Sequence, residues 1–128
     1  MHKNIMEKWV QALRSGEYKQ GSGVLHNTSN NTYCCLGVLC DIYQQEGNKF
    51  NSVSEGNWGV ETGNGWENIP ATFFDDRPDV LPEVVMRWAD ISCSAGSFDD
   101  DTLTTLNDDC GYTFDEIATV IEKEVEYL

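Results

Sequence analysis

The stretch from residue 32 to residue 43, TYCCLGVLCDIY, changes from strand-like to helix-like sequence within one apolar run. A polar, turn-forming run at 27–31 separates its first residues from another short apolar piece at 24–26, which predicts a β-hairpin. After the two adjacent cysteines, apolar residues continue at helical spacing and end near Gly47, which predicts a largely buried helix. We therefore expect a β-hairpin that leads directly into a buried helix.

The N-terminal segment predicts an amphipathic helix over residues 5–15. Its apolar residues recur at helical spacing, and Gly16 is a natural stop. Asn4 followed by Glu7 resembles a capping box, so we expect Asn4 to be the N-cap of this helix.

The C-terminal third predicts a helical hairpin that follows one more helix. The earlier helix, over 82–90, has a proline in its first turn, where the missing N–H does no harm. A short helix at 103–106 would be capped by an aspartate from 99–101. Thr113 and Glu116 form a second capping-box pattern, which predicts the start of a terminal amphipathic helix.

The remaining segment, 49–74, has apolar residues separated by Gly, Asn, Ser and Glu, which predicts short, irregular strands with long turns. A chain of 128 residues fits one core and is too short for two. The expected fold is therefore α+β, as a single domain over residues 1–128.

The net charge of −14 is distributed unevenly along the chain. Five basic and four acidic residues up to Lys49 give +1, whereas three basic and eighteen acidic residues from Phe50 onward give −15. Such a protein repels phosphate backbones, so we expect no direct nucleic-acid partner and no anionic membrane partner. Two exceptions stay open, namely a local basic pocket in the N-terminal third and an acidic surface that imitates nucleic acid. The N-terminus does not resemble a signal peptide, and no apolar run approaches the roughly 20 residues of a membrane span.

The five cysteines are an odd number with two adjacent, a poor disulfide framework that favours free thiols in a reducing cytosol. Cys34 or Cys35, at the start of the predicted buried helix, could be a nucleophile with His26 as its base. The apolar surroundings favour structural thiols instead. Neither the cysteine spacing nor the aspartate run fits a metal site, and we expect no metal, no cofactor and no catalytic set.

Candidate ligand-binding residues begin in the segment 14–20. Arg14 offers bidentate donors for phosphate, Tyr18 offers a ring for stacking, and Gln20 offers an amide for recognition. Gly21 lets a ligand approach the backbone closely. The alternative interpretation is a helix C-terminus followed by a turn, where Arg14 interacts favourably with the helix dipole.

Three further residues complete the candidate set. Asn107 and Asp108 form a second polar pair, which could equally be a turn with Asx-type hydrogen bonding. Tyr33 precedes the double cysteine and is the third.

Three segments together resemble a family of small, mostly uncharacterised proteins encoded by tailed bacteriophages and prophages. The segments are Trp9…Ala12-Leu13-Arg14-Ser15-Gly16-x-Tyr18-x-Gln20-Gly21-x-Gly23-x-Leu25, Tyr33-Cys34-Cys35-Leu36-Gly37-Val38-Leu39-Cys40-Asp41, and Leu103…Leu106-Asn107-Asp108…Gly111…Thr113-Phe114-x-Glu116-Ile117-Ala118…Ile121-Glu122. Cys110 departs from the family's pattern because it lengthens the turn before Gly111. The resemblance implies a viral accessory protein in the cytoplasm of an infected bacterial host, and it implies no reaction.

Three functions follow as hypotheses. The leading one is a phage anti-defence protein that sequesters a nucleotide-derived immune signalling molecule in a pocket on residues 14–20, completed in a homo-oligomer. The alternative is an acidic protein-interaction inhibitor that mimics nucleic acid and binds a host defence protein. The third is a thiol-dependent hydrolase or transferase.

Overall fold

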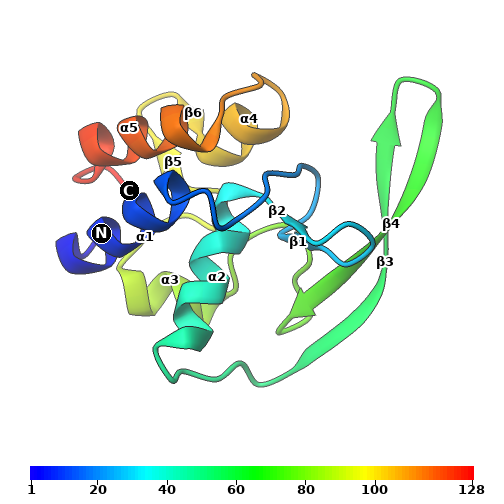
Figure 1. The fold of residues 1–128 in the computed structure, drawn as a ribbon, viewed down its shortest axis with the longest axis horizontal. Helices are drawn as coiled ribbons and strands as arrows, with labels where there is room; N and C mark the ends of the chain where they lie inside the picture. The colour runs from blue at the N-terminus through cyan, green and yellow to red at the C-terminus, as the bar shows by residue number, and fades with distance from the viewer.

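Helix α2 (Cys35–Gln45) lies in the middle of the computed structural model, which describes residues 1–128 (Figure 1). Every residue from Cys35 to Cys40 is buried, and the helix ends just before Gly47. The prediction of a largely buried helix after the double cysteine is therefore confirmed, and the fold is the expected α+β class.

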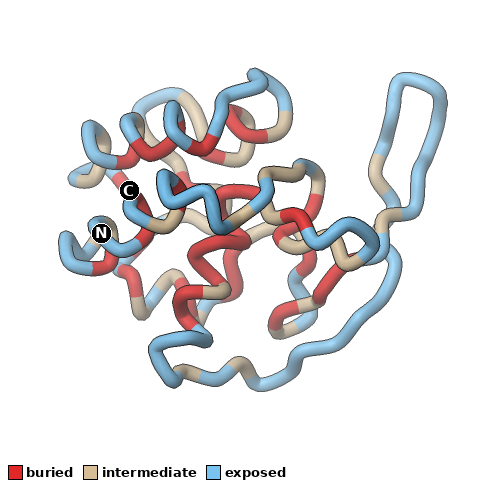
Figure 2. Tube along the Cα trace, in the orientation of Figure 1, coloured by how far each residue is buried: buried red, intermediate tan, exposed pale blue.

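The other helices surround α2 and supply the rest of the core. These are α1 (Lys3–Arg14), α3 (Glu83–Ala89), α4 (Leu103–Asp108) and α5 (Phe114–Glu124). Helix α1 packs against both α2 and α5, and α3 and α4 each contact α2. The buried stretches of all five helices face a common interior (Figure 2), where Trp9 is fully buried and donates its indole N–H to the carbonyl of Cys35 at 2.9 Å.

A short antiparallel hairpin precedes α2, as predicted, with strands β1 (His26–Asn27) and β2 (Thr32–Tyr33). The hairpin is anchored to the helix by close backbone contact, because a side chain on Gly37 would place its Cβ 1.8 Å from the carbonyl oxygen of Leu25. Strand β1 also pairs with β4 at Asn27 and Ala71, giving a four-stranded sheet in the order β2-β1-β4-β3.

Strands β3 (Val53–Thr62) and β4 (Gly65–Phe74) form a long hairpin that projects from the body of the molecule (Figure 1). Ten consecutive antiparallel pairs join them without a bulge, from Val53↔Phe74 to Thr62↔Gly65. The prediction of short, irregular strands with long turns is wrong here. Both faces of the outer part are largely solvated, so the strands need no alternation of apolar and polar residues to form their backbone ladder.

Two predicted helix caps are also wrong. Helix α1 begins at Lys3, so Asn4 lies inside it, and the N-cap is His2 without a side-chain cap bond. Asp99 and Asp100 form the turn between β5 (Ser97–Phe98) and β6 (Asp101–Thr102). This tight turn accommodates Asp99 at a φ of 47°, a conformation that aspartate tolerates.

The hydroxyl of Thr102 caps α4 in their place by accepting a hydrogen bond from the N–H of Thr105 at 3.1 Å. The capping box of Thr113 and Glu116 is confirmed at the start of α5. Helix α3 begins at Glu83, with Pro82 as the N-cap instead of a first-turn residue.

Candidate functional site

Asn107, at the end of α4, joins three distant parts of the chain through its buried side chain. Its Nδ2 donates to the carbonyl oxygen of Gly21 at 2.8 Å and to Oδ1 of Asp108 at 2.8 Å. Its Oδ1 accepts from the N–H of Cys35 at 3.2 Å and from Nε2 of Gln20 at 3.0 Å. These five residues form what we call the polar cluster. The cluster provides an acceptor for the buried N–H of Cys35, the first residue of α2. The first N–H groups of a helix have no carbonyl acceptor within the helix itself.

Gln20 completes the polar cluster by reaching the turn between α4 and α5. Its Nε2 also donates to the carbonyl oxygen of Tyr112 at 2.7 Å, and its Oε1 accepts from the N–H of Phe114 at 3.0 Å. Both ends of this amide are therefore occupied by the protein itself. Gly21 is required beside it, because a Cβ there would lie 2.3 Å from the hydroxyl oxygen of Thr32.

Asp108 lies at the edge of the polar cluster and is partly buried. Loss of water contact raises the pKa of its carboxyl, while the hydrogen bond from Asn107 lowers it by a smaller amount. A hollow of about 330 Å³ opens beside the cluster, and its lining contains no basic residue. The lining residues are Gln20, Gly21, Ser22, Asn107, Gly111, Tyr112 and Thr113.

A second group, next to the polar cluster, contains Tyr18 and Tyr33. The Tyr18 ring meets the Tyr33 ring edge-on with centroids 5.2 Å apart, and the Tyr18 hydroxyl donates to Asp41 on α2. His26 stacks on the other side of Tyr33 with centroids 4.3 Å apart. Burial is the main reason that the pKa of both tyrosines is raised, so neither phenol is prepared to act as a base.

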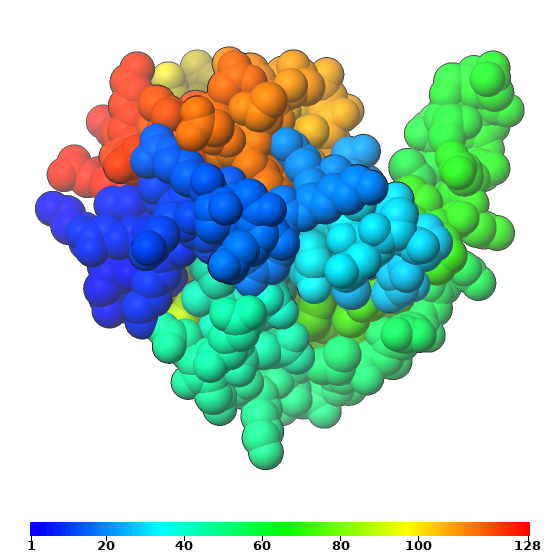
Figure 3. Space-filling view, in the orientation of Figure 1, coloured from blue at the N-terminus to red at the C-terminus, as the bar shows by residue number.

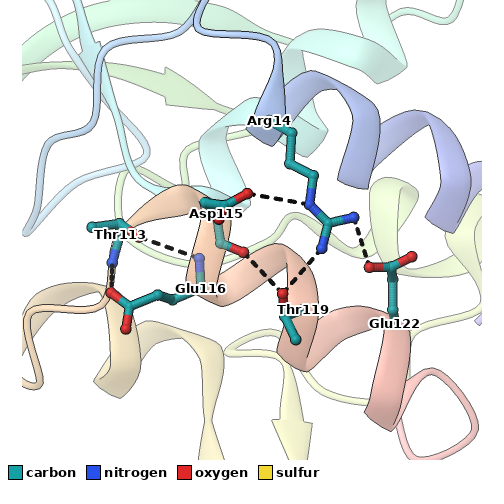
Figure 4. A network of polar contacts seen from close by, with 6 residues as sticks. All are labelled: Arg14, Thr113, Asp115, Glu116, Thr119 and Glu122. Carbon is teal, nitrogen blue, oxygen red and sulfur yellow. Dashed lines mark hydrogen bonds and ion pairs between the residues drawn. The ribbon is translucent and has the colours of Figure 1, made fainter.

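Arg14 lies apart from these groups, at the interface between α1 and α5 (Figure 4). Its Nη1 lies 2.7 Å from a carboxylate oxygen of Glu122, and its Nε lies 3.3 Å from Oδ1 of Asp115. Its Nη2 donates to the hydroxyl of Thr119 at 3.0 Å. All three nitrogens of the guanidinium are thus used within the protein, so Arg14 offers no free cation for a phosphate, whereas the exposed Lys19 in the same segment forms no ion pair.

The structure therefore brings six of the seven predicted ligand-binding residues to one region. Backbone bonds connect the two groups, because the N–H of Gly21 donates to the carbonyl oxygen of Tyr33 at 2.8 Å. The side chains of Tyr18, Gln20, Asn107 and Asp108 form hydrogen bonds within the protein, which is the behaviour of a structural junction.

The double cysteine is also turned inward. Cys34, Cys35 and Cys40 are buried, and this burial raises the pKa of Cys34 to about 12 and that of the other two well above the usual value. His26 bonds Thr72 and Asn31 through its two ring nitrogens, at 2.8 Å each. These contacts argue against the thiol-based hypothesis, because a nucleophile requires an accessible thiolate and a base that faces it.

The projecting β3–β4 hairpin, which we call the arm, is a feature that the sequence reasoning missed as a site. It carries Glu55, Glu61 and Glu67 and has no lysine or arginine over residues 53–74. Trp66 near its tip is 75% exposed, the largest exposure among the large apolar residues that remain on the surface. Figure 3 shows the outer part of the arm standing clear of the body. The available signals were the exclusively acidic charge and the Gly-Asn-Gly turn at 63–65.

Two further features concern metal ligands and membrane-spanning helices. No group of three or more His, Cys, Asp or Glu side chains is placed to hold a metal ion. No helix has both the length and the apolar character needed to cross a bilayer.

The fold and the site together define a small α+β domain with an internally bonded polar cluster and a projecting acidic arm. The chain belongs to the family described as a domain of unknown function (DUF8296), whose model matches residues 1–125. No curated protein and no solved structure matches the chain. The resemblance to phage proteins therefore stays a prediction, and function has to be argued from the residues themselves.

Proposed function

We propose that this protein is a binding protein that occupies a basic surface of a protein partner through its acidic arm. The observation that carries the proposal is the arm itself, in which two ten-residue strands bear three glutamates and no basic residue. A two-stranded hairpin is only marginally stable in water by itself. The outer part of the arm would therefore be stabilised by contact with a binding partner. Its negative charge favours a partner surface rich in Lys and Arg, such as one that binds nucleic acid.

The biological setting is part of the same proposal. The resemblance to tailed-phage proteins supports a role in the cytoplasm of an infected bacterium, with a host defence protein as the partner. An acidic protein that covers a nucleic-acid-binding surface would block that surface without catalysing a reaction. Charge-driven contacts also speed the encounter, which suits an inhibitor that must act early.

A second candidate is the capture of a nucleotide-type small molecule. It is supported by the gathering of Tyr18, Gln20, Tyr33 and Asn107 in one region, next to a hollow of about 330 Å³. Arg14 is held by Asp115 and Glu122, and no basic residue lines the hollow, so the positive charge for a phosphate would come from the exposed Lys19 beside Gln20 or from a second copy of the chain. A homo-oligomer would complete the pocket in this candidate, whereas the first proposal needs none.

Two experiments separate the two candidates. Immobilised protein is exposed to a nuclease-treated bacterial lysate, and captured proteins are identified by mass spectrometry across a salt series and in the presence of duplex DNA. A partner that is released by salt, displaced by DNA and lost when Glu55, Glu61 and Glu67 are all changed to Gln supports the proposal. A native mass spectrum with small-molecule extract tests the second candidate, because capture would add one repeated mass per subunit of an oligomer. Captured partners whose binding is unchanged by salt and by duplex DNA would refute the acidic-arm proposal.

A further inference from the structure

The outer edge of strand β3 is an unpaired strand edge with a specific arrangement of charge. The sheet order β2-β1-β4-β3 leaves β3 with a neighbour on one side only. In an antiparallel pair every second residue turns its N–H and C=O away from the neighbouring strand, so about half of the ten residues of β3 offer these groups to solvent. No proline, lysine or bulge interrupts β3, although such features commonly prevent pairing at sheet edges.

One face of the arm carries two of its three glutamates and the exposed aromatic ring. Residues alternate between faces along a strand, so Glu55 and Glu61 lie on the same face. The register pairs Glu61 with Trp66, and a Cβ on Gly59 would lie 3.7 Å from Cε3 of Trp66, which places the indole on that face as well. We call these three residues, Glu55, Glu61 and Trp66, the acidic face. An indole beside a carboxylate is a favourable site for a Lys or Arg side chain.

The opposite face of the arm lies close to Gly23 of the body at Val60 and Ile69. A Cβ on Gly23 would lie 3.4 Å from Cδ1 of Ile69 and 3.6 Å from a methyl group of Val60. Glu67 pairs with Val60 and therefore also lies on that side. At the base of the arm the acidic face also meets the body, because Thr72, which pairs with Glu55, and Phe74 are buried on the same side. Glu55, Glu61 and Trp66 are themselves exposed, so their side chains are accessible to an incoming chain.

The geometry points to strand addition, in which an extended, basic segment of a protein partner pairs with the outer edge of β3. This inference rests on the proposed function and specifies how the partner is held. Glu55 and Glu61 are six residues apart, so matching cations must also be six residues apart, about 20 Å along a strand. Charge selects this occupant over a second copy, because β3 against β3 would bring four glutamates together between chains that each carry −14.

The test uses two synthetic ten-residue peptides with a background of Thr and Val, labelled with fluorescein. One has Arg at positions 2 and 8, which places both cations on one face, and the other has Arg at 2 and 7, which places them on opposite faces. Anisotropy measures binding to the full-length protein. We expect the first peptide to bind about tenfold more tightly than the second, because only its two cations can reach both glutamates at once. Hydrogen exchange should show new protection in β3 with the first peptide.

Protein variants provide the matched comparison. Glu61→Lys should weaken binding of the first peptide at least about tenfold, and Trp66→Ala should weaken it by about threefold to tenfold. Glu67→Lys has the same change in net charge on the opposite face and should change binding by less than about twofold. Far-UV circular dichroism checks that each variant is folded.

Three results would overturn strand addition. These are equal binding of both peptides, equal losses from Glu61→Lys and Glu67→Lys, and a native mass spectrum of dimers that the first peptide does not dissociate. The first two would indicate attraction by net charge alone and leave the proposed function intact. The lysate experiment fails separately, through a lack of salt-sensitive and DNA-sensitive partners.

Discussion

Replacing Asn107 with alanine is expected to reduce the free energy of unfolding by about 3 kcal/mol. The change leaves the N–H of Cys35 without an acceptor and the carbonyl oxygen of Gly21 without its donor. An unsatisfied buried backbone group costs about 1–3 kcal/mol. Cys35 is fully buried and is counted near the middle of that range, whereas Gly21 is partly exposed and is counted near the bottom.

Urea denaturation followed by tryptophan fluorescence measures this loss. With a slope of about 2 kcal/mol per molar, the midpoint should fall by about 1.5 M. Asn57→Ala is the matched control, because Asn57 is exposed on β3, and its loss should stay within about 0.5 kcal/mol. A loss below about 1 kcal/mol for Asn107→Ala, in a folded protein, would refute the reasoning. The side chain would then be free for a ligand, as the nucleotide candidate requires.

Three further predictions concern the thiols and the contact between hairpin and helix. Cys93 and Cys110 should be alkylated in the native protein at neutral pH, whereas the three buried thiols should react only after unfolding. Cys93 should react faster than Cys110, because hydrogen bonds from Ser97 and from backbone N–H groups lower the pKa of the Cys93 thiol. Peptide mass spectrometry of the alkylated protein measures both differences. Burial raises the pKa of the Cys34 thiol to about 12 in the folded protein, so folding favours the protonated thiol. The resulting stabilisation is complete below pH 9 and is lost as the pH rises from 9 toward 12. Urea midpoints that stay level from pH 8 to pH 11 would contradict this expectation. Gly37→Ala should prevent folding or cost more than about 3 kcal/mol, because its methyl group would overlap the carbonyl oxygen opposite, and a wild-type melting curve would refute this close approach.

The amphipathic helices could be predicted from the sequence because each has one buried and one exposed face, and the buried helix α2 could be predicted because its apolar residues continue at helical spacing after the double cysteine. Trp9 and Val10 repeat with helical spacing because α1 packs on the body along a single stripe. The capping box at Thr113 was readable because both of its partners lie within one turn. The long strands of the arm could not be predicted, because their outer parts face solvent on both sides and their sequence shows no alternation of apolar and polar residues.

In the candidate site, the sequence indicated the chemistry of single residues but not which distant residues they contact. The sequence suggested Gln20 and Asn107 as ligand-binding candidates, but it could not show that they bond to each other, because they are 87 positions apart and meet only in the folded chain. It also could not show that Arg14 is occupied, since its partner Thr119 lies 105 positions away. Residue chemistry suggested what each side chain can bind, and tertiary structure determined what it does bind.

The distribution of satisfied polar groups indicates where a binding function belongs. Every buried side-chain nitrogen or oxygen has a hydrogen-bond partner within the protein, and the polar cluster around Asn107 is complete without a ligand. A ligand at that position would have to replace bonds that hold α2, α4 and the segment at Gln20 together. The outer edge of β3 has no neighbouring strand, so a partner strand can pair with its backbone groups without breaking any bond in the fold. Association at β3 therefore leaves the core unchanged, which is the reason to place the function on the arm.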